Sequence, residues 1–367
     1  MLDLNNRNWA SFKISDLFQP ARGTEKNMTS LQVGDVPLIS ARNCDNGVKA
    51  FVSIPSERLH HGHAITLNND GDGGAGLAYY QPMEFALDTH VTELRPRDSI
   101  GNLSRYAMQF VAASISKQRT LFGHGRSISL KRLNLLRVML PIDESGNPDW
   151  QFMEDYIRER EVIQVERCRE FLMKRITVIE ERESKTGPRH LPSLSEKTWH
   201  KFKAFGPDGL FQIKTTNSSI DAVRLVKGRD QRCPYITRTD SNNGIARFVS
   251  SRNKEMGFDL AGTITIGLDT QTAYYQPANY VTGQNIQIVS GENLSEPVAL
   301  FLLSILRSQM KAKFNWGGNG ATLGRLLELQ IMLPATDDGL PDYSYMSSYS
   351  HNIALHTLKR QLAFLNR

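Results

Sequence analysis

The sequence predicts an α+β protein that consists of two homologous mixed α/β units joined by long helices. Three observations indicate this architecture. Stretches of the first half recur in the second half, strand-like runs precede helical ones in each half, and each half closes with a helical segment. Each unit has about 190 residues, which is enough to bury a hydrophobic core of its own.

The internal repeat extends through almost the whole chain. Its best-matched pairs are PLISARNCDNGVKAFV at 37–52 with PYITRTDSNNGIARFV at 234–249, YYQP at 79–82 with YYQP at 274–277, and RVMLPIDESGNPDWQFM at 137–153 with QIMLPATDDGLPDYSYM at 330–346. NWASFKISDLF at 8–18 matches TWHKFKAFGPDGLF at 198–211 more loosely. Two long copies indicate a duplicated domain and not a solenoid of short repeats.

Short strands and turns are predicted in the first part of each unit. Val36–Ser40 and Ala64–Leu67 are apolar runs of strand length, and Asn46-Gly47 and Asn243-Gly244 are signals of a tight turn. Further elements follow along the chain, namely helices at about 103–117 and about 296–313, a glycine-rich loop, a short helix near 130–136 and a strand that ends at Pro141.

A long helix is predicted after the first unit, because residues 151–186 contain no Gly or Pro and are dense in Glu, Arg and Lys. Its apolar stripe comprises Phe152, Tyr156, Ile163, Phe171, Leu172, Ile176 and Ile179. A shorter C-terminal helix has the stripe Met346, Tyr349, Ile353, Leu358, Leu362 and Leu365. Because neither helix can bury its stripe alone, we expect the two to pack as an antiparallel coiled coil.

The predicted domain boundaries follow from these changes of pattern. They are 1–150 for the first unit, 151–190 for the central spacer helix, 191–342 for the second unit and 343–367 for the C-terminal helix. If all of 151–186 is helical, that segment is about 54 Å long at a rise of 1.5 Å per residue.

A glycine-rich stretch, GDGGAG at 71–76, places Gly71, Gly73 and Gly76 in the G-x-G-x-x-G pattern of dinucleotide-binding sites. That pattern needs a helix whose N-terminus meets the pyrophosphate. Here the strand-like LAYYQP follows, and the second copy, ITIGLDTQTAYYQP, keeps the strand with one glycine in the loop. We therefore predict a hairpin-like turn and no nucleotide site.

Each unit contains a basic tract without acidic residues, from Ser99 to Ile142 and from Pro297 to Leu327. Such tracts are expected where a surface neutralises phosphates, with an ordinary basic face as the alternative. The candidate phosphate-binding residues are Lys117, Arg119, His124, Arg126, Lys131, Arg132, Lys311, Lys313 and Arg325. In each tract a hydroxyl residue, Ser129 or Thr322, is placed to cap the short helix that follows.

Two equivalent loops, SARNCDNG and TRTDSNNG, hold residue types that pair with guanine and adenine edges. The candidate base-reading residues are Arg42, Asn43, Asn46, Arg238, Thr239, Asn242 and Asn243. The two loops differ in side chains, as two readers of different sequences would. For Asn46 and Asn243, a purely turn-forming role is the alternative.

Known catalytic patterns are weak in this chain. Pro148-Asp149 with Glu183-Ser184-Lys185 matches the PD…ExK pattern of metal-dependent nucleases only formally, because the second part lies far along a predicted helix. No Asn/Asp-Pro-Pro-aromatic motif of adenine methyltransferases is present, and LHHGH at 59–63 is more typical of a loop than of a zinc site. We predict no catalysis by this chain alone and no metal site.

The composition limits which binding partners and which cellular compartment are expected. The net charge of +6 permits nucleic-acid binding without requiring it. No apolar run approaches the length of about 18 residues that a membrane span needs, so no membrane association is expected. The three cysteines, Cys44, Cys168 and Cys233, form no C-x-x-C pair, which fits a reducing cytoplasm.

Together these features resemble the specificity (S) subunits of type I restriction–modification systems, in which two repeated domains are each followed by a helical region. The motifs LPIDESGNPDWQFM and LPATDDGLPDYSYM carry the resemblance. The stretches DGGAGLAYYQP and LPIDESGNPDWQFMEDYI are most similar to the S subunits of type IIB, BcgI-like systems. The resemblance covers almost the whole chain.

The resemblance implies that 1–150 and 191–342 are target recognition domains, each reading one half of a split sequence in double-stranded DNA. A methyltransferase subunit, or a fused methyltransferase and endonuclease, would carry the chemistry. S-adenosylmethionine and Mg²⁺ would belong to that partner, and this chain would bind neither. The alternative hypothesis is a non-catalytic scaffold of two protein-binding modules that does not contact DNA.

Overall fold

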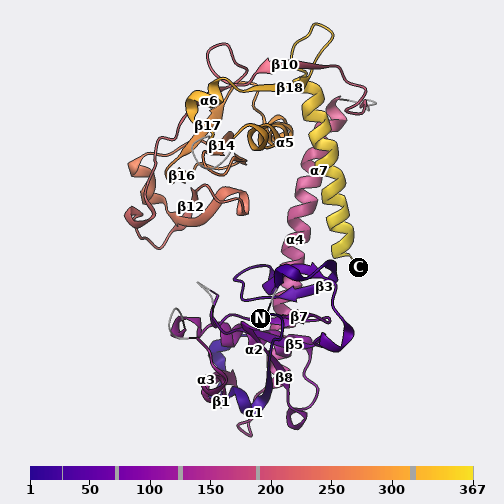
Figure 1. Ribbon diagram of the computed structural model, residues 1–367, viewed down its shortest axis with the longest axis vertical. Coiled ribbons are helices and arrows are strands. Elements are labelled where there is room, and N and C mark those ends of the chain that lie inside the picture. The colour runs from indigo at the N-terminus through magenta and orange to yellow at the C-terminus, as the bar shows by residue number, and fades with distance from the viewer. Residues whose placement is uncertain (27, 71–73, 123–126, 187–190, 315–319, 367) are drawn as a thin grey trace. The chain divides into compact units, whose positions relative to one another are not determined.

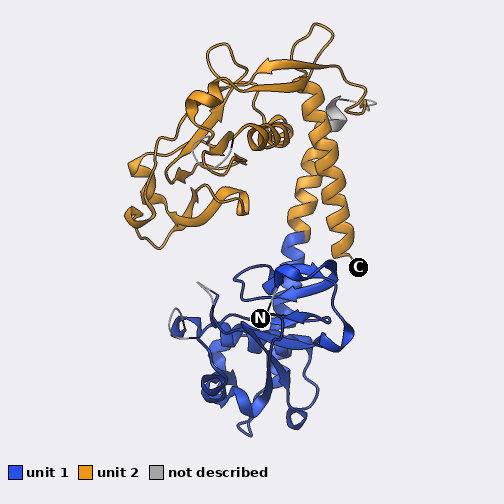
Figure 2. Ribbon diagram, in the orientation of Figure 1, with its two compact units in different colours: residues 1–168 blue, residues 169–367 orange. Residues whose placement is uncertain are grey.

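The structure is a computed structural model that describes all residues except 27, 71–73, 123–126, 187–190, 315–319 and 367, and only the backbone of 183–186. The chain divides into two compact units, Met1–Cys168 and Arg169–Arg367 (Figure 2). The two units are described one after the other below.

The first unit consists of three small sheets and their covering helices (Figure 1). Its elements are β1 (Trp9–Lys13), α1 (Ile14–Leu17), β2 (Phe18–Arg22), β3 (Val33–Ile39), β4 (Val48–Val52), β5 (Ala64–Asn68), β6 (Ala78–Gln81), β7 (Ala86–Leu87), β8 (Val91–Pro96), α2 (Arg105–Ser116), α3 (Leu130–Leu135), β9 (Arg137–Pro141) and the first part of α4 (Trp150–Thr186). The sheets are β1-β9, the antiparallel β2-β8-β5-β6, and β4-β3-β7, in which β7 runs parallel to β3.

The second unit repeats this topology. Its elements are the last part of α4, β10 (Trp199–Lys203), β11 (Gln212–Thr215), β12 (Gln231–Ile236), β13 (Ile245–Ser250), β14 (Thr263–Gly267), β15 (Thr272–Gln276), β16 (Val281–Thr282), β17 (Ile286–Ser290), α5 (Glu296–Lys313), α6 (Leu323–Leu327), β18 (Gln330–Pro334) and α7 (Tyr343–Leu365). Its sheets are β10-β18, β11-β17-β14-β15 and β13-β12-β16, with β16 parallel to β12. The predicted duplication of a mixed α/β unit is confirmed.

The duplication holds at the level of single residue pairs. In the β5–β6 hairpin Thr66 faces Tyr79, and in the β14–β15 hairpin Thr265 faces Tyr274. The repeated Tyr-Tyr-Gln therefore occupies the same register in both four-stranded sheets. Because side chains alternate between the faces of a strand, equivalent tyrosines point to equivalent sides.

Each main core lies between the four-stranded sheet and one covering helix. In the first unit α2 contacts β5 and β6, and Leu67, Leu94 and Val111 are buried there. In the second unit α5 contacts β15, and Ile266 and Leu302 are buried in the same way. The strands that carry the Tyr-Tyr-Gln repeat are thus fixed by a helix-on-sheet layer in both units.

The Pro-Asp dipeptides begin the two long helices. Asp149 Oδ1 accepts a hydrogen bond from the Phe152 amide at 2.9 Å, and Asp342 Oδ1 accepts one from the Tyr345 amide at 2.9 Å. Both aspartates therefore act as N-caps, which satisfy amides that have no partner inside the helix. The N-cap role explains why a Pro-Asp dipeptide precedes each of the two long helices. A nuclease site is not needed to explain the recurrence.

Within the second unit, the last part of α4 packs antiparallel to α7 (Figure 1). Arg169 donates to the Leu365 carbonyl at 3.2 Å, whereas Glu180, further along α4, pairs with Lys359 at 2.7 Å. Positions rise along α4 as they fall along α7. The predicted antiparallel helix pair is therefore confirmed in this unit.

The buried stripe of α4 in the second unit is narrower than predicted. Leu172, Ile176 and Ile179 are buried as expected, but Phe171 is 61% exposed, and Ile353 on α7 is 55% exposed. The assignment of these two residues to the buried stripes is wrong. One helical step turns a side chain by about 100°, so Phe171 points away from the seam that its neighbour Leu172 enters.

An aromatic trio joins the first strand, the covering helix and the long helix of each unit. In the first unit Phe110 packs on Trp9 and Tyr156, with ring centroids 6.2 and 5.8 Å apart. In the second unit the trio is Trp199, Phe301 and Tyr349, with centroid distances of 6.4 and 5.7 Å from Phe301. These pairs have the offset and edge-on geometry that aromatic rings prefer.

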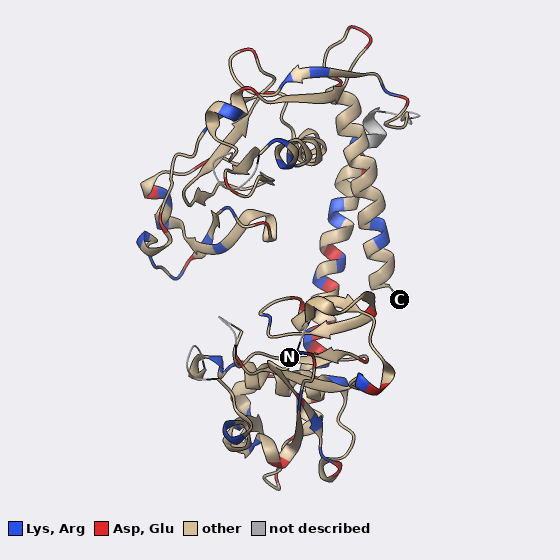
Figure 3. Ribbon diagram, viewed as in Figure 1, with Lys and Arg blue, Asp and Glu red and all other residues tan. Residues whose placement is uncertain are grey.

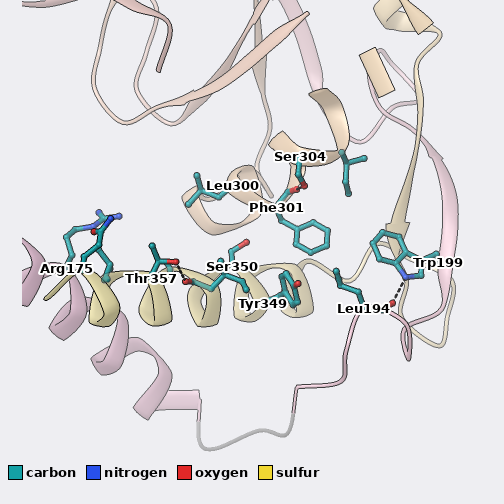
Figure 4. Close-up of a pocket in the computed structure, with 14 residues that line it drawn as sticks. Arg175, Leu194, Trp199, Leu300, Phe301, Ser304, Tyr349, Ser350 and Thr357 are labelled. Carbon is teal, nitrogen blue, oxygen red and sulfur yellow. Dashed lines mark hydrogen bonds between the residues drawn. The ribbon is translucent and has the colours of Figure 1, made fainter. Parts of the chain in front are cut away.

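In the second unit this trio lines a groove of about 690 Å³ between α5, α7 and the segment before β10 (Figure 4). Leu300 and Ile353 extend its apolar wall, and Arg175 lies at one end. Phe301 therefore packs on Trp199 and Tyr349 and borders the groove together with them.

We predict that Phe301→Ala lowers the stability of the second unit by about 3–5 kcal/mol, because it leaves a cavity between Trp199 and Tyr349. Hydrogen exchange of the α5 and β10 amides checks this, with faster exchange expected there and not in the first unit. Phe110→Ala is the matched variant and should show the reverse pattern. Phe364→Ala, at a site 70% exposed, should change the stability and the exchange rates very little. Equal acceleration in both units by Phe301→Ala would contradict the prediction.

Candidate nucleic-acid interface

The glycine-rich stretch belongs to a hairpin. It connects the antiparallel strands β5 and β6, and none of its described residues, 74–76, begins a helix. Gly76 has a φ of +81°, and a Cβ there would lie 2.7 Å from the Phe122 ring. Gly71 and Gly73 lie outside the described residues. The predicted hairpin-like turn is confirmed, and a loop between two strands offers no helix N-terminus to a pyrophosphate.

A left-handed turn closes the candidate base-reading loop in the first unit. Asn46 and Gly47 have φ values of +52° and +79°. The Asn46 amide nitrogen donates to the Tyr80 carbonyl at 3.0 Å, and the Gln81 amide nitrogen donates to the Asn46 carbonyl at 3.0 Å. Gln81 also donates to the Thr66 hydroxyl at 3.0 Å, which ties the turn to strand β5.

The second unit closes its loop by the same contacts. Asn243 and Gly244 have φ values of +56° and +76°. The Asn243 amide donates to the Tyr275 carbonyl at 2.9 Å, and Gln276 donates to the Asn243 carbonyl at 3.2 Å and to Thr265 at 3.1 Å. The side chains of Asn46 and Asn243 therefore hold these turns, and base reading by the two residues stays a prediction.

The start of each loop lies against the end of a central strand. In the first unit Asn68 Nδ2 and the Tyr79 hydroxyl both donate to the Arg42 carbonyl, at 2.8 and 3.2 Å. In the second unit Gly267 takes the place of Asn68, and a Cβ there would lie 3.4 Å from the Arg238 Cα. One unit thus uses a hydrogen bond and the other a close backbone approach to place the same loop.

The loop arginines are paired with nearby carboxylates. Arg42 donates to Asp45 Oδ2 at 2.9 Å and to the Cys44 sulfur at 3.2 Å, and these contacts raise the pKa of Arg42, the Cys44 contact most. Arg238 pairs with Asp269, which lies in the turn between β14 and β15. Both guanidinium groups remain accessible, and a carboxylate partner limits the directions in which their other N–H groups point.

Three further predicted base-reading residues lie on the same loops. Asn43 and Asn242 are exposed, and the Thr239 hydroxyl is 2.9 Å from the Ser241 hydroxyl. The structure therefore gathers the seven loop candidates into one exposed loop per unit. Their contacts with bases stay a prediction.

Sequence reasoning missed a cluster at the second loop, formed by Asp240, Tyr274 and Arg307. Asp240 Oδ1 accepts from the Tyr274 hydroxyl at 2.9 Å and from Arg307 at 2.6 Å. The hydrogen bond from Tyr274, followed by that from Arg307, lowers the pKa of Asp240. The recurrence of Tyr274 in the YYQP repeat and the position of Arg307 in an acid-free tract were the available signals.

The described phosphate candidates lie on helix ends and short helices. Lys117 is the C-cap of α2, with Arg119 in the turn after it, and Lys131 and Arg132 are on α3. Lys311 and Lys313 are in the last turn of α5, and Arg325 is on α6 (Figure 3). All seven are exposed. His124 and Arg126 lie outside the described residues.

Arg132 and Arg325 also hold the segment in front of their own helix. Arg132 donates to the Ser127 carbonyl at 2.8 Å, and Arg325 donates to the Gly320 carbonyl at 3.0 Å, each five positions back. Ser129 caps α3 as predicted, through a 3.2 Å bond from the Arg132 amide. Thr322 stands at the N-cap of α6 but makes no capping bond with its side chain, so that part of the prediction is wrong.

The segment before each short helix is anchored to the turn beside the loop-bearing sheet. The Ile128 amide donates to the Asn69 carbonyl at 2.7 Å, and the Ala321 amide donates to the Leu268 carbonyl at 3.0 Å. The His90 carbonyl accepts a hydrogen bond from the Asn69 amide at 2.9 Å. The His90 ring is 2.9 Å from the Asp70 carboxylate, and this hydrogen bond raises the pKa of His90. The basic tract and the candidate base-reading loop are therefore held by one framework in each unit.

The remaining motifs have structural partners. His60 is 2.7 Å from Glu93, His61 is 3.3 Å from Glu84, and His63 is 3.0 Å from the Tyr80 hydroxyl, so the LHHGH histidines diverge. Across the described ranges, no three His, Cys, Asp or Glu side chains converge as metal ligands would. Within the same ranges no helix is long and apolar enough to cross a membrane.

A family model identifies the duplicated units. The model of the type I restriction modification DNA specificity domain matches residues 6–167 and again residues 198–363. The two matches coincide with the two copies of the fold and cover most of the chain. The chain therefore belongs to the family of restriction–modification specificity subunits.

Individual relatives agree with this assignment. The specificity subunit S.BcgI of a type II restriction enzyme from Heyndrickxia coagulans is 24% identical over 158 residues, or 43% of this chain and 45% of that protein. The chain thus matches about half the length of this curated relative. The crystal structure of a type I S subunit from M. genitalium aligns with 100% of this chain and 95% of its own, at 14% identity and a TM-score of 0.50. That likeness shows a shared fold.

We predict that Gln276→Leu loosens the candidate base-reading loop of the second unit, because the Asn243 carbonyl and the Thr265 hydroxyl lose their buried donor at a cost of about 1–3 kcal/mol. Faster hydrogen exchange of the Thr237 and Gly244 amides measures the effect. Gln284→Leu, which removes an exposed glutamine of the same unit, is the control and should leave this exchange unchanged. Unchanged exchange in Gln276→Leu would show that the glutamine does not hold the turn.

Proposed function

We propose that this specificity-family chain is the DNA-recognition subunit of a restriction–modification complex, in which each unit reads one half of a bipartite target in double-stranded DNA. The observation that carries the proposal is the pair of braced, exposed loops. Each loop has the same backbone, held by Gln81 or Gln276, and different exposed side chains. A constant frame with variable side chains is what two readers of different half-sites require.

The basic residues beside each loop supply the second part of the proposal. Lys and Arg at the end of α2, on α3, at the end of α5 and on α6 are suited to phosphate contacts, which position a protein on DNA without specifying sequence. The loops carry Arg, Asn and Thr, whose donors and acceptors match base edges in the major groove. Affinity and specificity are thus assigned to neighbouring but separate groups.

The chemistry is assigned to partner subunits. We propose that a methyltransferase subunit, or a fused methyltransferase and endonuclease, binds S-adenosylmethionine and Mg²⁺ and is directed to its target by this chain. The first support is the family membership. The second is that Asp149 caps a helix and the LHHGH histidines pair with separate partners, so these motifs have structural roles in this chain.

The test is to co-express the chain with the methyltransferase subunit of its system and to map methylation on a random-sequence DNA library. We expect a split motif, with two short defined blocks around a fixed gap of undefined bases. Omission of this chain is the control and should abolish the motif. Methylation without a motif, or identical methylation when this chain is omitted, would reject the proposal and favour the scaffold hypothesis.

We further predict that Lys131→Ala and Lys311→Ala weaken DNA binding by the complex on all sequences. Each variant should lower the slope of log affinity against log salt by about 1, because one phosphate contact and its counterions are lost. Binding is measured over a salt series on target and random duplexes. Lys227→Ala, also in the second unit but outside the acid-free tract, is the charge-matched control. A changed motif with unchanged salt slope would contradict the assignment to phosphates.

A further inference from the structure

We propose that Asp240 and Arg307 form a reading pair for one C·G base pair in the second unit. This inference rests on the proposed function, because it names the chemistry by which one unit selects its half of the target. It assigns specificity to a helix residue, Arg307, as well as to the loop.

The Asp240 carboxylate is exposed and held in place. Asp240 lies in the loop between β12 and β13, with its side chain 50% exposed. Its Oδ1 accepts both from the Tyr274 hydroxyl, at 2.9 Å, and from Arg307, at 2.6 Å. Neither of these bonds uses Oδ2. A carboxylate fixed through one oxygen can present the other to an amino group.

Arg307 is fixed by two different contacts. Its guanidinium group bonds to Asp240 and lies over the Tyr274 ring, 5.0 Å from the centroid. The aromatic face and the carboxylate together restrict a side chain that is otherwise long and flexible. The Arg307 side chain is 28% exposed, and its planar guanidinium has more N–H donors than the single bond to Asp240 uses.

The two groups are complementary to the two bases of one pair. In the major groove cytosine presents an amino donor, which a carboxylate accepts, and guanine presents O6 and N7, to which arginine donates. Because Asp240 and Arg307 are in contact, the acceptor and the donor are side by side, as the two edges of a C·G pair are. Arg307 also offsets the negative charge that would otherwise repel DNA phosphates.

Among its described residues the first unit lacks this arrangement. Ser116 stands at the position of Arg307, equally far from the helix N-caps Ser104 and Ser295. Ser116 accepts a 2.8 Å bond from the Ala78 amide and so ties α2 to strand β6. The first loop instead pairs Arg42 with Asp45 inside the loop itself. The acid–arginine pair is thus built from different positions in the two units, which suits two different half-sites.

The experiment maps methylation by the complete complex on the random-sequence library with Asp240→Ala and with Arg307→Ala. Glu255→Ala and Arg224→Ala are the controls, because each removes the same charge from an exposed site of the same unit. Arg42→Ala, in the first unit, identifies the other block of the motif. Thermal unfolding of each variant separates loss of stability from loss of specificity.

We expect both variants to relax the same C·G position in one block, with discrimination there falling roughly 5- to 150-fold, the range for one lost base contact. The other block should be unchanged. Arg307→Lys keeps the charge but not the fork and should relax the same position. An intact motif with uniformly lower methylation, or relaxation at a position that is not C·G, would overturn this inference while the proposed function stands. No split motif with the unsubstituted chain would instead reject the proposed function itself.

Discussion

The candidate base-reading loops of both units depend on one constraint, a left-handed Asn-Gly turn closed by a buried glutamine. Gln81 and Gln276 each donate to the carbonyl of the turn asparagine and to a threonine of the neighbouring strand. Because both glutamines are buried, a shift of the turn would leave their amides unpaired at high cost. The loop backbone is therefore constant, and its exposed side chains can differ without loss of the fold.

Much of this fold was predictable because the sequence contains two versions of it. Comparison of the copies shows which residues recur. The recurring Asn-Gly and Tyr-Tyr-Gln segments are hydrogen-bonded to each other in both units, through the turn asparagine and the carbonyl of the second tyrosine. The capping role of Ser129 and the antiparallel helix pair followed from local rules of helix ends and apolar spacing. Local patterns therefore predicted the frame of the candidate site.

The side-chain chemistry of the site was less predictable, because it depends on contacts between distant positions. Asp240 meets Tyr274 and Arg307 at separations of 34 and 67 residues, for which no spacing rule exists. Local rules also failed where tertiary packing decides between adjacent positions. Phe171 fits the spacing of the predicted apolar stripe of α4, but Leu172 is the residue buried between α4 and α7. Thr322 occupies the N-cap position of α6, but its side chain makes no capping hydrogen bond.

If the proposed function holds, the division between frame and side chains explains how two units that each read few bases select one bipartite target. Under the proposed function, each unit adds a few base contacts, each worth about 1–3 kcal/mol, to a background of phosphate contacts that favours no sequence. Since both units lie on one chain, binding of the second half-site is intramolecular, and the two contributions combine without new contacts. Each loop can then change its side chains independently, because Gln81 and Gln276 keep the backbone of each one in place.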